Sequence, residues 1–225
     1  MSSRQIVKGV QRPPAEPSSL IRSLTSNVAP RQGEGFPVKL SHVEHRSGHA
    51  RLFGLDISTA PAPQRHYAAE IAAVQSQDGE ARLVFAQRSL GADGLESALV
   101  VRMNPHAASQ MLESLDTMAS PGVAKIADLM SIRPLALTDI SQRPNSTARV
   151  VANFAAVAIS GYDTCIDFYQ ASPWSMKHAP LTNELALDAV VRVDIQTALF
   201  LSVMEGLRAV VSTLPVADPD GDKQE

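Results

Sequence analysis

The chain has 225 residues and a net charge of −3, with 44% hydrophobic and 19% charged residues. This length can bury a sizeable core, and the composition excludes wholesale disorder, collagen, a disulfide scaffold and a coiled coil. The near-neutral charge and the 4% aromatic share argue against a nucleic-acid partner. Only one cysteine is present and no apolar run reaches about 20 residues, so we predict a cytoplasmic protein without a membrane segment.

Both ends of the chain are predicted to be tails. Residues 1–36 are rich in Pro, Gly and Ser and carry mostly positive charge. Such a stretch buries too little apolar surface to fold alone, so we expect a flexible arm; the alternative is a docking segment that folds on a partner. Residues 215–225 form an acidic tail, whose D-x-D-G-D fragment lacks the distal Glu ligand of a calcium loop.

An internal repeat organises the chain between these tails. Eight positions match at an offset of 83: Ala69, Ala72, Ala73, Val74, Leu83, Phe85, Gln87 and Ser89 match Ala152, Ala155, Ala156, Val157, Ile166, Phe168, Gln170 and Ser172. Further on, Val100-Val101-Arg102 matches Val190-Val191-Arg192 at an offset of 90, which predicts a seven-residue insertion in the loop 173–183. A collinear series with one insertion is typical of a duplicated unit.

The predicted elements follow this repeat. Strands 37–44 and 50–58 come first, and the first repeat then has strands 67–75, 81–88 and 98–103 and a helix that Asn104 caps. Segment 123–130 has a helical pattern and segment 134–138 an extended one. The second repeat has strands 149–160, 164–171 and 185–193, and Asp194 is the predicted N-cap of a final helix that runs to about Ser212.

These elements predict an α+β fold. Residues 37–132 contain the first β-β-β-α repeat with its preceding strands, and residues 133–214 contain the second repeat. We expect the two repeats to form a pseudo-twofold antiparallel sheet domain with packed helices.

The final helix is apolar over more than one face. Its main stripe is Leu199, Val203, Leu207, Val210 and Leu214, with Phe200, Met204 and Val211 beside it. A helix that is apolar over so wide an angle is central to the fold or lies at a subunit interface. We therefore predict a homo-oligomer that associates through this helix.

The sequence also resembles two known families. The second repeat carries Ala152-Asn153-Phe154, Tyr162-Asp163 and Val191-Arg192-Val193, and the first repeat carries Val100-Val-Arg-Met-Asn-Pro-His-Ala. In these residues the chain resembles the bacterial family known as domain of unknown function three-four-six-seven, although Ile195–Ala198 lacks that family's Pro-x-His-Ala helix start. The resemblance implies a fold and a bacterial origin, and it implies no reaction.

The second resemblance is one of element order. Arg133-Pro-Leu-Ala-Leu-Thr follows the first repeat's helix, and Leu55-Asp-Ile-Ser precedes its strands. This arrangement is similar to that of the SecB family of export chaperones, in which strands lead into a helix and then an extended segment. It implies a protein that holds unfolded polypeptides.

The sequence contains few side chains that could act in catalysis or bind a metal. His42, His45 and His49 could bind zinc if the fold brought them together, but strand geometry separates His42 from His45, so the alternative is solvated turn histidines. Cys165 is expected to be a buried thiol, and Asp167 to serve a turn, an edge or a cross-strand pair. We predict no catalytic residue and no cofactor.

The function predicted from these features is therefore a non-enzymatic interaction or scaffold protein of the bacterial cytoplasm. Its candidate partner-binding residues are Trp174, Met176, Leu199, Val203, Leu207 and Val210. One alternative is a SecB-like chaperone. The other is a metal-binding protein or enzyme that uses the three histidines.

Overall fold

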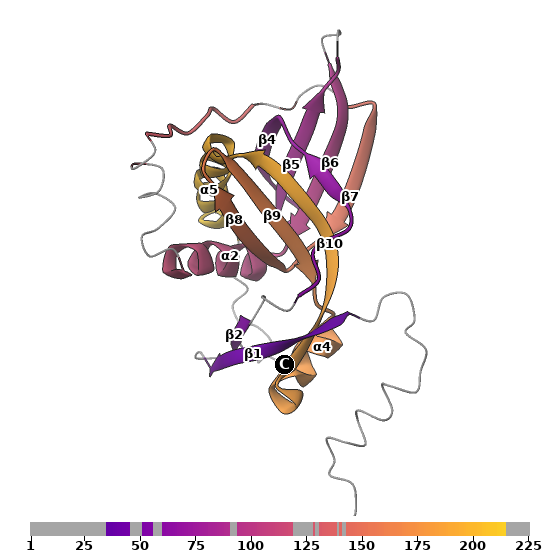
Figure 1. Ribbon diagram of the computed structural model, residues 1–225, viewed down its shortest axis with the longest axis vertical. Coiled ribbons are helices and arrows are strands. Elements are labelled where there is room, and N and C mark those ends of the chain that lie inside the picture. Colours follow the sequence, from indigo (N-terminus) through magenta and orange to yellow (C-terminus); the bar gives the residue numbers. More distant parts are fainter. Residues whose placement is uncertain are drawn as a thin grey trace, which may run out of the picture. The chain divides into compact units, whose positions relative to one another are not determined.

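The computed structural model describes residues 35–45, 51–55, 60–90, 94–118, 128, 131–138, 140 and 143–214. Most of the predicted arm, all of the predicted acidic tail and nearly all of segment 123–130 lie outside these ranges. Within them the chain is α+β, as predicted, with strands in two sheets and three helices (Figure 1). The elements in chain order are β1 (Phe36–His45), β2 (Arg51–Leu55), β3 (His66–Ala68), β4 (Ile71–Gln77), β5 (Glu80–Arg88), β6 (Leu95–Met103), α2 (Pro105–Met118), β7 (Ser146–Val151), β8 (Phe154–Ser160), β9 (Asp163–Gln170), α4 (Pro173–Thr182), β10 (Glu184–Gln196) and α5 (Thr197–Val211).

Most strands pair antiparallel, as successive strands joined by short turns do. One sheet has the order β4-β5-β6-β7, and the other has the order β2-β1-β10-β9-β8, with β3 also paired to β10. Two pairings are parallel, β6 with β7 and β10 with β3. These two depart from the antiparallel arrangement expected from the sequence.

Both parallel pairings arise where the chain leaves one sheet and enters the other. β3 lies on β10 and continues into β4 of the other sheet, and β7 lies on β6 and continues into β8. At each corner the first residue donates its N–H to the sheet that the chain leaves, and the second donates to the sheet that it enters. The four bonds run from Ala69 to the carbonyl of Asp194, from Glu70 to Ala86, from Ala152 to Arg102 and from Asn153 to Tyr169.

The second corner corrects one predicted element. The sequence pattern predicts a single strand over residues 149–160, but the strand ends at Val151 and resumes at Phe154. The side chain of Asn153 stabilises the bend, because its Oδ1 accepts the N–H of Ala171 and its Nδ2 donates to the carbonyl of the same residue, both at 2.8 Å. The backbone N–H groups at the bend thus stay bonded, which lets a buried chain turn at low cost.

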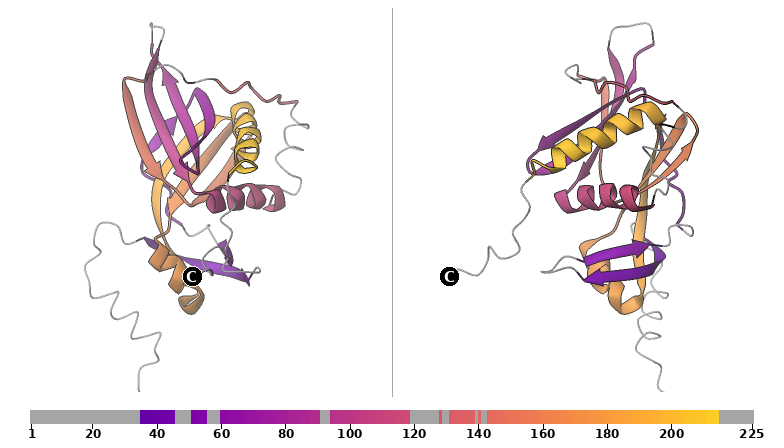
Figure 2. Two further views of the ribbon diagram at one scale, coloured as in Figure 1. Left: turned by 180° about the vertical axis from the view of Figure 1, so that it is seen from behind. Right: turned by 90° about the vertical axis from the view of Figure 1, so that its left-hand side faces the viewer.

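The main core lies between the inner faces of the two sheets. Phe85 of β5 and Phe168 of β9 are fully buried, and their ring centroids lie 6.2 Å apart. Helices α2 and α5 lie next to each other and complete this core (Figure 2). Leu199, Val203 and Leu207 of α5 belong to it.

An extended segment covers another part of α5. The N–H of Leu135 donates to the carbonyl of Ala198 at 3.2 Å, and the hydroxyl of Ser202 donates to the carbonyl of Leu135. Gly206 lies so close to this segment that a Cβ there would come within 2.7 Å of Cδ1 of Leu137. The chain's own residues therefore bury much of the apolar surface that makes this helix unusual in the sequence.

The N-termini of two helices test the predicted caps. Asn104 caps α2 as predicted, since its Oδ1 accepts the N–H of Ala107 at 2.8 Å. Asp194 does not cap the final helix, because β10 stays paired with β9 as far as Gln196 and α5 begins at Thr197.

The predicted insertion loop is in fact helix α4. Ser172 caps it by accepting the N–H of Ser175 at 3.1 Å, Pro173 opens it, and Asn183 ends it in the left-handed region with φ of 55°. Together with β1 and the first part of β10 it encloses a second, smaller core. Its buried members are Val38, Leu40, Tyr169, Ala171, Ala179, Leu185 and Leu187.

Candidate protein-interaction surface

Helix α4 exposes large side chains along one side. Trp174 is 64% exposed and Leu181 is 81% exposed. His178 lies between them in the sequence, and its ring stacks on the Trp174 indole with centroids 4.3 Å apart. Its Nδ1–H donates to the carbonyl of Trp174 at 2.8 Å, which holds the imidazole against the indole. Spacings of four and seven residues place these three side chains on one face of a helix. We name this face, Trp174, His178 and Leu181, the α4 surface.

The opposite side of α4 is anchored to β10. Ser175 and Ala179 are buried there. The hydroxyl of Ser175 accepts the N–H of Ala186 at 2.9 Å and donates to the carbonyl of the same residue at 3.3 Å. The α4 surface is therefore presented on a support that hydrogen bonds hold in place, which lowers the ordering cost of binding.

The candidate residues predicted from the sequence fall in different places. Trp174 lies on the α4 surface, whereas Met176 is half-buried against the second core. Leu199, Val203 and Leu207 are buried in the main core, and Val210 is half-buried at its edge. The structure thus separates the α5 residues from Trp174. His178 and Leu181 are absent from the predicted set because their segment is predicted as a loop, in which helical spacing has no meaning.

The structure does not test the predicted metal site. His49 and the side chains of His42 and His45 lie outside the described part of the chain. In the part that is described, no group of three or more His, Cys, Asp or Glu side chains could hold a metal ion. In that same part, no helix combines the length and the apolar character needed to cross a bilayer.

Asp167 forms a cross-strand pair, one of the roles expected for it. Its two carboxylate oxygens accept Nε–H and Nη2–H of Arg192 at 2.6 Å each, and Asp167 is only 9% exposed. The pKa of Arg192 is raised, chiefly by this hydrogen bond to Asp167. Burial raises the pKa of the neighbouring Tyr169. The pair locks β9 to β10.

Cys165 is half-buried on the same sheet. It lines a shallow hollow with Asp163, Thr164 and Asp194. The hydroxyls of Thr164 and Thr197 bond to each other at 2.9 Å in the buried region beside it. The bond between the two hydroxyls ties α5 to β9.

Comparisons with family models, with curated proteins and with solved structures found no match to this chain. The resemblances to the family of unknown function and to SecB therefore remain predictions from the sequence.

Proposed function

We propose that this chain is a non-enzymatic interaction protein of the bacterial cytoplasm that binds a partner protein through the α4 surface. The observation that carries the proposal is the exposure of Trp174 and Leu181 on a helix anchored along its other side. Tryptophan is favoured at the centres of protein interfaces, and adjacent exposed apolar side chains mark such sites. The stacked His178 adds a polar edge to this contact.

We further propose that two duplicated β-β-β-α units build the domain around a pseudo-twofold axis. The first unit is β4, β5, β6 and α2, and the second unit is β8, β9, β10 and α5. Strand pairing supports this: Ile71 pairs with Ala86 and Phe154 with Tyr169, so both partners are related by 83. Leu83 pairs with Val101 and Ile166 with Val193, where the second partners are related by 92.

The α4 surface belongs to a connection that differs in length between the two proposed units. The step from 83 to 92 adds nine residues to the second unit, rather than the seven that sequence matching predicts. Seven of them fall between β9 and β10, where the connection 171–183 with α4 replaces the connection 89–94 of the first unit. The remaining difference arises within the strands, where the pairing of β10 shifts between Ala189 and Val191. An element carried by one copy alone is not required by the shared fold, and connections of this kind are frequent carriers of function.

The alternative is a SecB-like chaperone, which one observation favours. Segment 133–138 runs along α5 without regular secondary structure, in the place that the SecB resemblance implies, and Leu135 in it is 46% exposed. A chaperone of this kind would bind many unfolded chains, whereas the α4 surface suits a particular folded partner. The two functions therefore predict different binding partners.

Cross-linking followed by quantitative affinity purification from the native host tests the proposal. The double variant Trp174→Ala/Leu181→Ala removes both apolar side chains of the α4 surface. The matched control Leu90→Ala/Tyr162→Ala removes two large exposed side chains from elsewhere on the chain. Since these sites are exposed, both variants should keep the wild-type melting temperature.

We expect the wild type and the control to capture the same partner, and the α4 double variant to capture at least about tenfold less of it. Equal capture by both variants would contradict the proposal. Light scattering on the three proteins shows whether the partner is a second copy of this chain. Suppressed aggregation of a chemically unfolded client protein, unaffected by either variant, would support the chaperone instead.

A further inference from the structure

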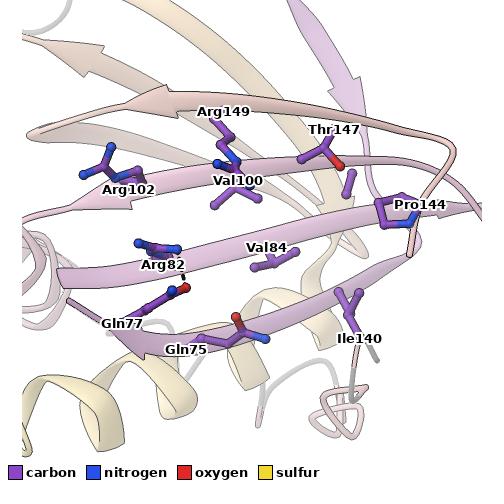
Figure 3. Close-up of a pocket in the computed structure, with 11 residues that line it drawn as sticks. Gln75, Gln77, Arg82, Val84, Val100, Arg102, Ile140, Pro144, Thr147 and Arg149 are labelled. Carbon is purple, nitrogen blue, oxygen red and sulfur yellow. Dashed lines mark hydrogen bonds between the residues drawn. The ribbon is translucent and has the colours of Figure 1, made fainter. Parts of the chain in front are cut away.

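A groove crosses the outer face of the β4-β5-β6-β7 sheet, away from the α4 surface. Its cavity volume is about 260 Å³. Figure 3 shows that arginines from three neighbouring strands line it: Arg82 of β5, Arg102 of β6 and Arg149 of β7. Val84 and Val100 lie beside them and make an apolar floor, and Ile140 and Pro144 close one end.

The charge of this groove is only partly balanced by the protein. Arg102 donates from Nε and Nη2 to Glu80 at 2.7 and 3.0 Å, and Arg82 donates to Asp78 at 2.7 Å. Among the described residues, the side chain of Arg149 has no hydrogen-bond or ion-pair partner, although its backbone pairs with Val100. The described residues of the lining include no carboxylate. One guanidinium therefore faces the groove without a counter-charge from the described part of the chain.

A second observation points to a missing acceptor. Nε of Arg82 is buried and has no hydrogen-bond partner within the described ranges, although the rest of that guanidinium is bonded to Asp78 and Gln77. Leaving a charged N–H buried and unbonded is costly, and native structures usually satisfy such groups with a ligand or water. Gln75 and Thr147 add an amide and a hydroxyl to the same lining.

The corresponding place on the other sheet shows what the groove lacks. Val84 pairs with Val100 across β5 and β6, and Asp167 pairs with Arg192 across β9 and β10 at the positions related by 83 and 92. On that sheet the carboxylate and the guanidinium bind each other. On this sheet two valines leave an apolar floor, and the flanking Arg82 and Arg102 bind acidic residues that lie outside the lining.

We propose that this groove binds a small organic anion. Its carboxylate or phosphate oxygens would accept hydrogen bonds from Arg149 and, once Arg82 shifts enough to uncover its buried Nε, from that group as well. Its apolar body would lie on Val84 and Val100. Guanidinium groups suit both oxyanions because they donate two parallel hydrogen bonds. The small volume suits a compact molecule and excludes a polymer from full enclosure.

Chemical-shift titration of the full chain tests the site with four probes. Benzoate and phenyl phosphate combine an anionic head with an apolar ring, inorganic phosphate supplies the head alone, and benzyl alcohol supplies the ring alone. We expect at least one of the two combined probes to shift resonances of β5, β6 and β7, and to bind at least about tenfold more tightly than either partial probe. Whichever combined probe binds identifies the preferred head group.

Two variants locate the binding. Arg149→Gln should lower the affinity for the probe by about tenfold or more, since it removes the unpaired charge. Lys177→Gln on α4 is the matched control, because it removes a cation outside the groove, and it should leave the affinity unchanged. The proposal is overturned if neither combined probe shifts these strands, if inorganic phosphate or benzyl alcohol binds as tightly as the combined probe that binds best, or if Arg149→Gln and Lys177→Gln have the same effect.

Discussion

The two proposed units pair their strands in the same register up to the shift between Ala189 and Val191 in β10, but they present different side chains on their outer faces. Their inner faces are alike: Leu83 and Phe85 of the first unit and Ile166 and Phe168 of the second are all fully buried. On the outer faces, a Val84–Val100 pair stands where the second unit has Asp167–Arg192. The shared core therefore fixes the register of both units, because a slip by one residue would turn the buried side chains outward.

The outer faces can differ because the side chains on one face do not have to match those on the other. The Asp167–Arg192 pair gains Coulomb energy and two hydrogen bonds, and it loses the hydration of both ions. The Val84–Val100 pair has neither term. Replacing a buried ion pair by apolar side chains is often neutral or stabilising, so the two solutions are interchangeable in principle. Four predictions test how far this holds.

The largest effect is expected in the shared core. Phe85→Ala and Phe168→Ala each remove a fully buried ring from the contact between the two sheets. Each should lower the free energy of unfolding by about 3–5 kcal/mol in urea titrations. A cost below about 1 kcal/mol for one of them would show that the two units do not share this core equally.

The second prediction exchanges one outer face for the other. Arg192→Val alone leaves the carboxylate of Asp167 buried without its partner and should cost about 3–5 kcal/mol. The double variant Asp167→Val/Arg192→Val copies the first unit and should cost less than the single variant. Urea unfolding measures both. If the double variant is the less stable of the two, the ion pair is needed for the fold and the units are not interchangeable here.

The third prediction concerns the contact between α5, β4 and segment 131–138. Gly206→Ala places a Cβ 2.7 Å from Cδ1 of Leu137 and 3.1 Å from Cγ2 of Val74. Overpacking should outweigh the gain in helix propensity and leave a net loss of about 1 kcal/mol. Leu137→Ala in the same chain should relieve the clash. Gly94→Ala is the control, since a Cβ at Gly94 meets nothing within 4 Å and should change stability little.

The smallest effect is expected at Asp188, on the part of β10 next to its irregular pairing. Burial raises the pKa of this carboxyl above its ordinary value of 3.8. A raised folded-state pKa favours the protonated form, so the stabilisation is present at low pH and is lost as the pH rises through that pKa. Asp188→Asn should therefore be more stable than the wild type at pH 7, by less than about 1 kcal/mol.

The pH series supplies the check on that prediction. Thermal melts of the wild type and Asp188→Asn should converge as the pH falls below 3.8, the carboxyl's ordinary pKa. A difference that stays constant across this range would mean that titration of Asp188 contributes nothing.

Much of the local structure can be predicted from the sequence, because it depends on near neighbours. Strands β5 and β6, the Asn104 cap and the strand candidates that correspond to β1 and β2 agree with the alternation and capping rules. Sequence matching gives the third strands an offset of 90, and the pairing gives 92. A shift of two residues keeps every side chain on the same face, so alternation cannot separate the two values. An offset of 92 from Pro105, the first residue of α2, would also place the start of α5 at Thr197.

The missed features depend on distant parts of the chain, with one exception. The corner at Ala152–Asn153 contains no Gly or Pro, and its bonds go to Arg102 and Tyr169, so nothing local marks it. The covering of α5 by segment 131–138 is equally non-local. Helix α4 is the exception, since Ser172-Pro173 is an N-cap and first-turn signal from which the helix is predictable. With that helix in place, its spacing rules would reveal the whole α4 surface.

The two corners determine what happens when the chain is divided. A cut between α2 and β7 leaves β7 on the C-terminal fragment, although its partner β6 is on the N-terminal one. It also leaves β3 on the N-terminal fragment, although its partner β10 is on the other. Each fragment then holds the strand that completes its counterpart's sheet, and the Phe85–Phe168 contact joins the two. Separately expressed fragments should therefore reassemble without a covalent link, so that the chain behaves as two complementing halves and neither half as an independently folded domain.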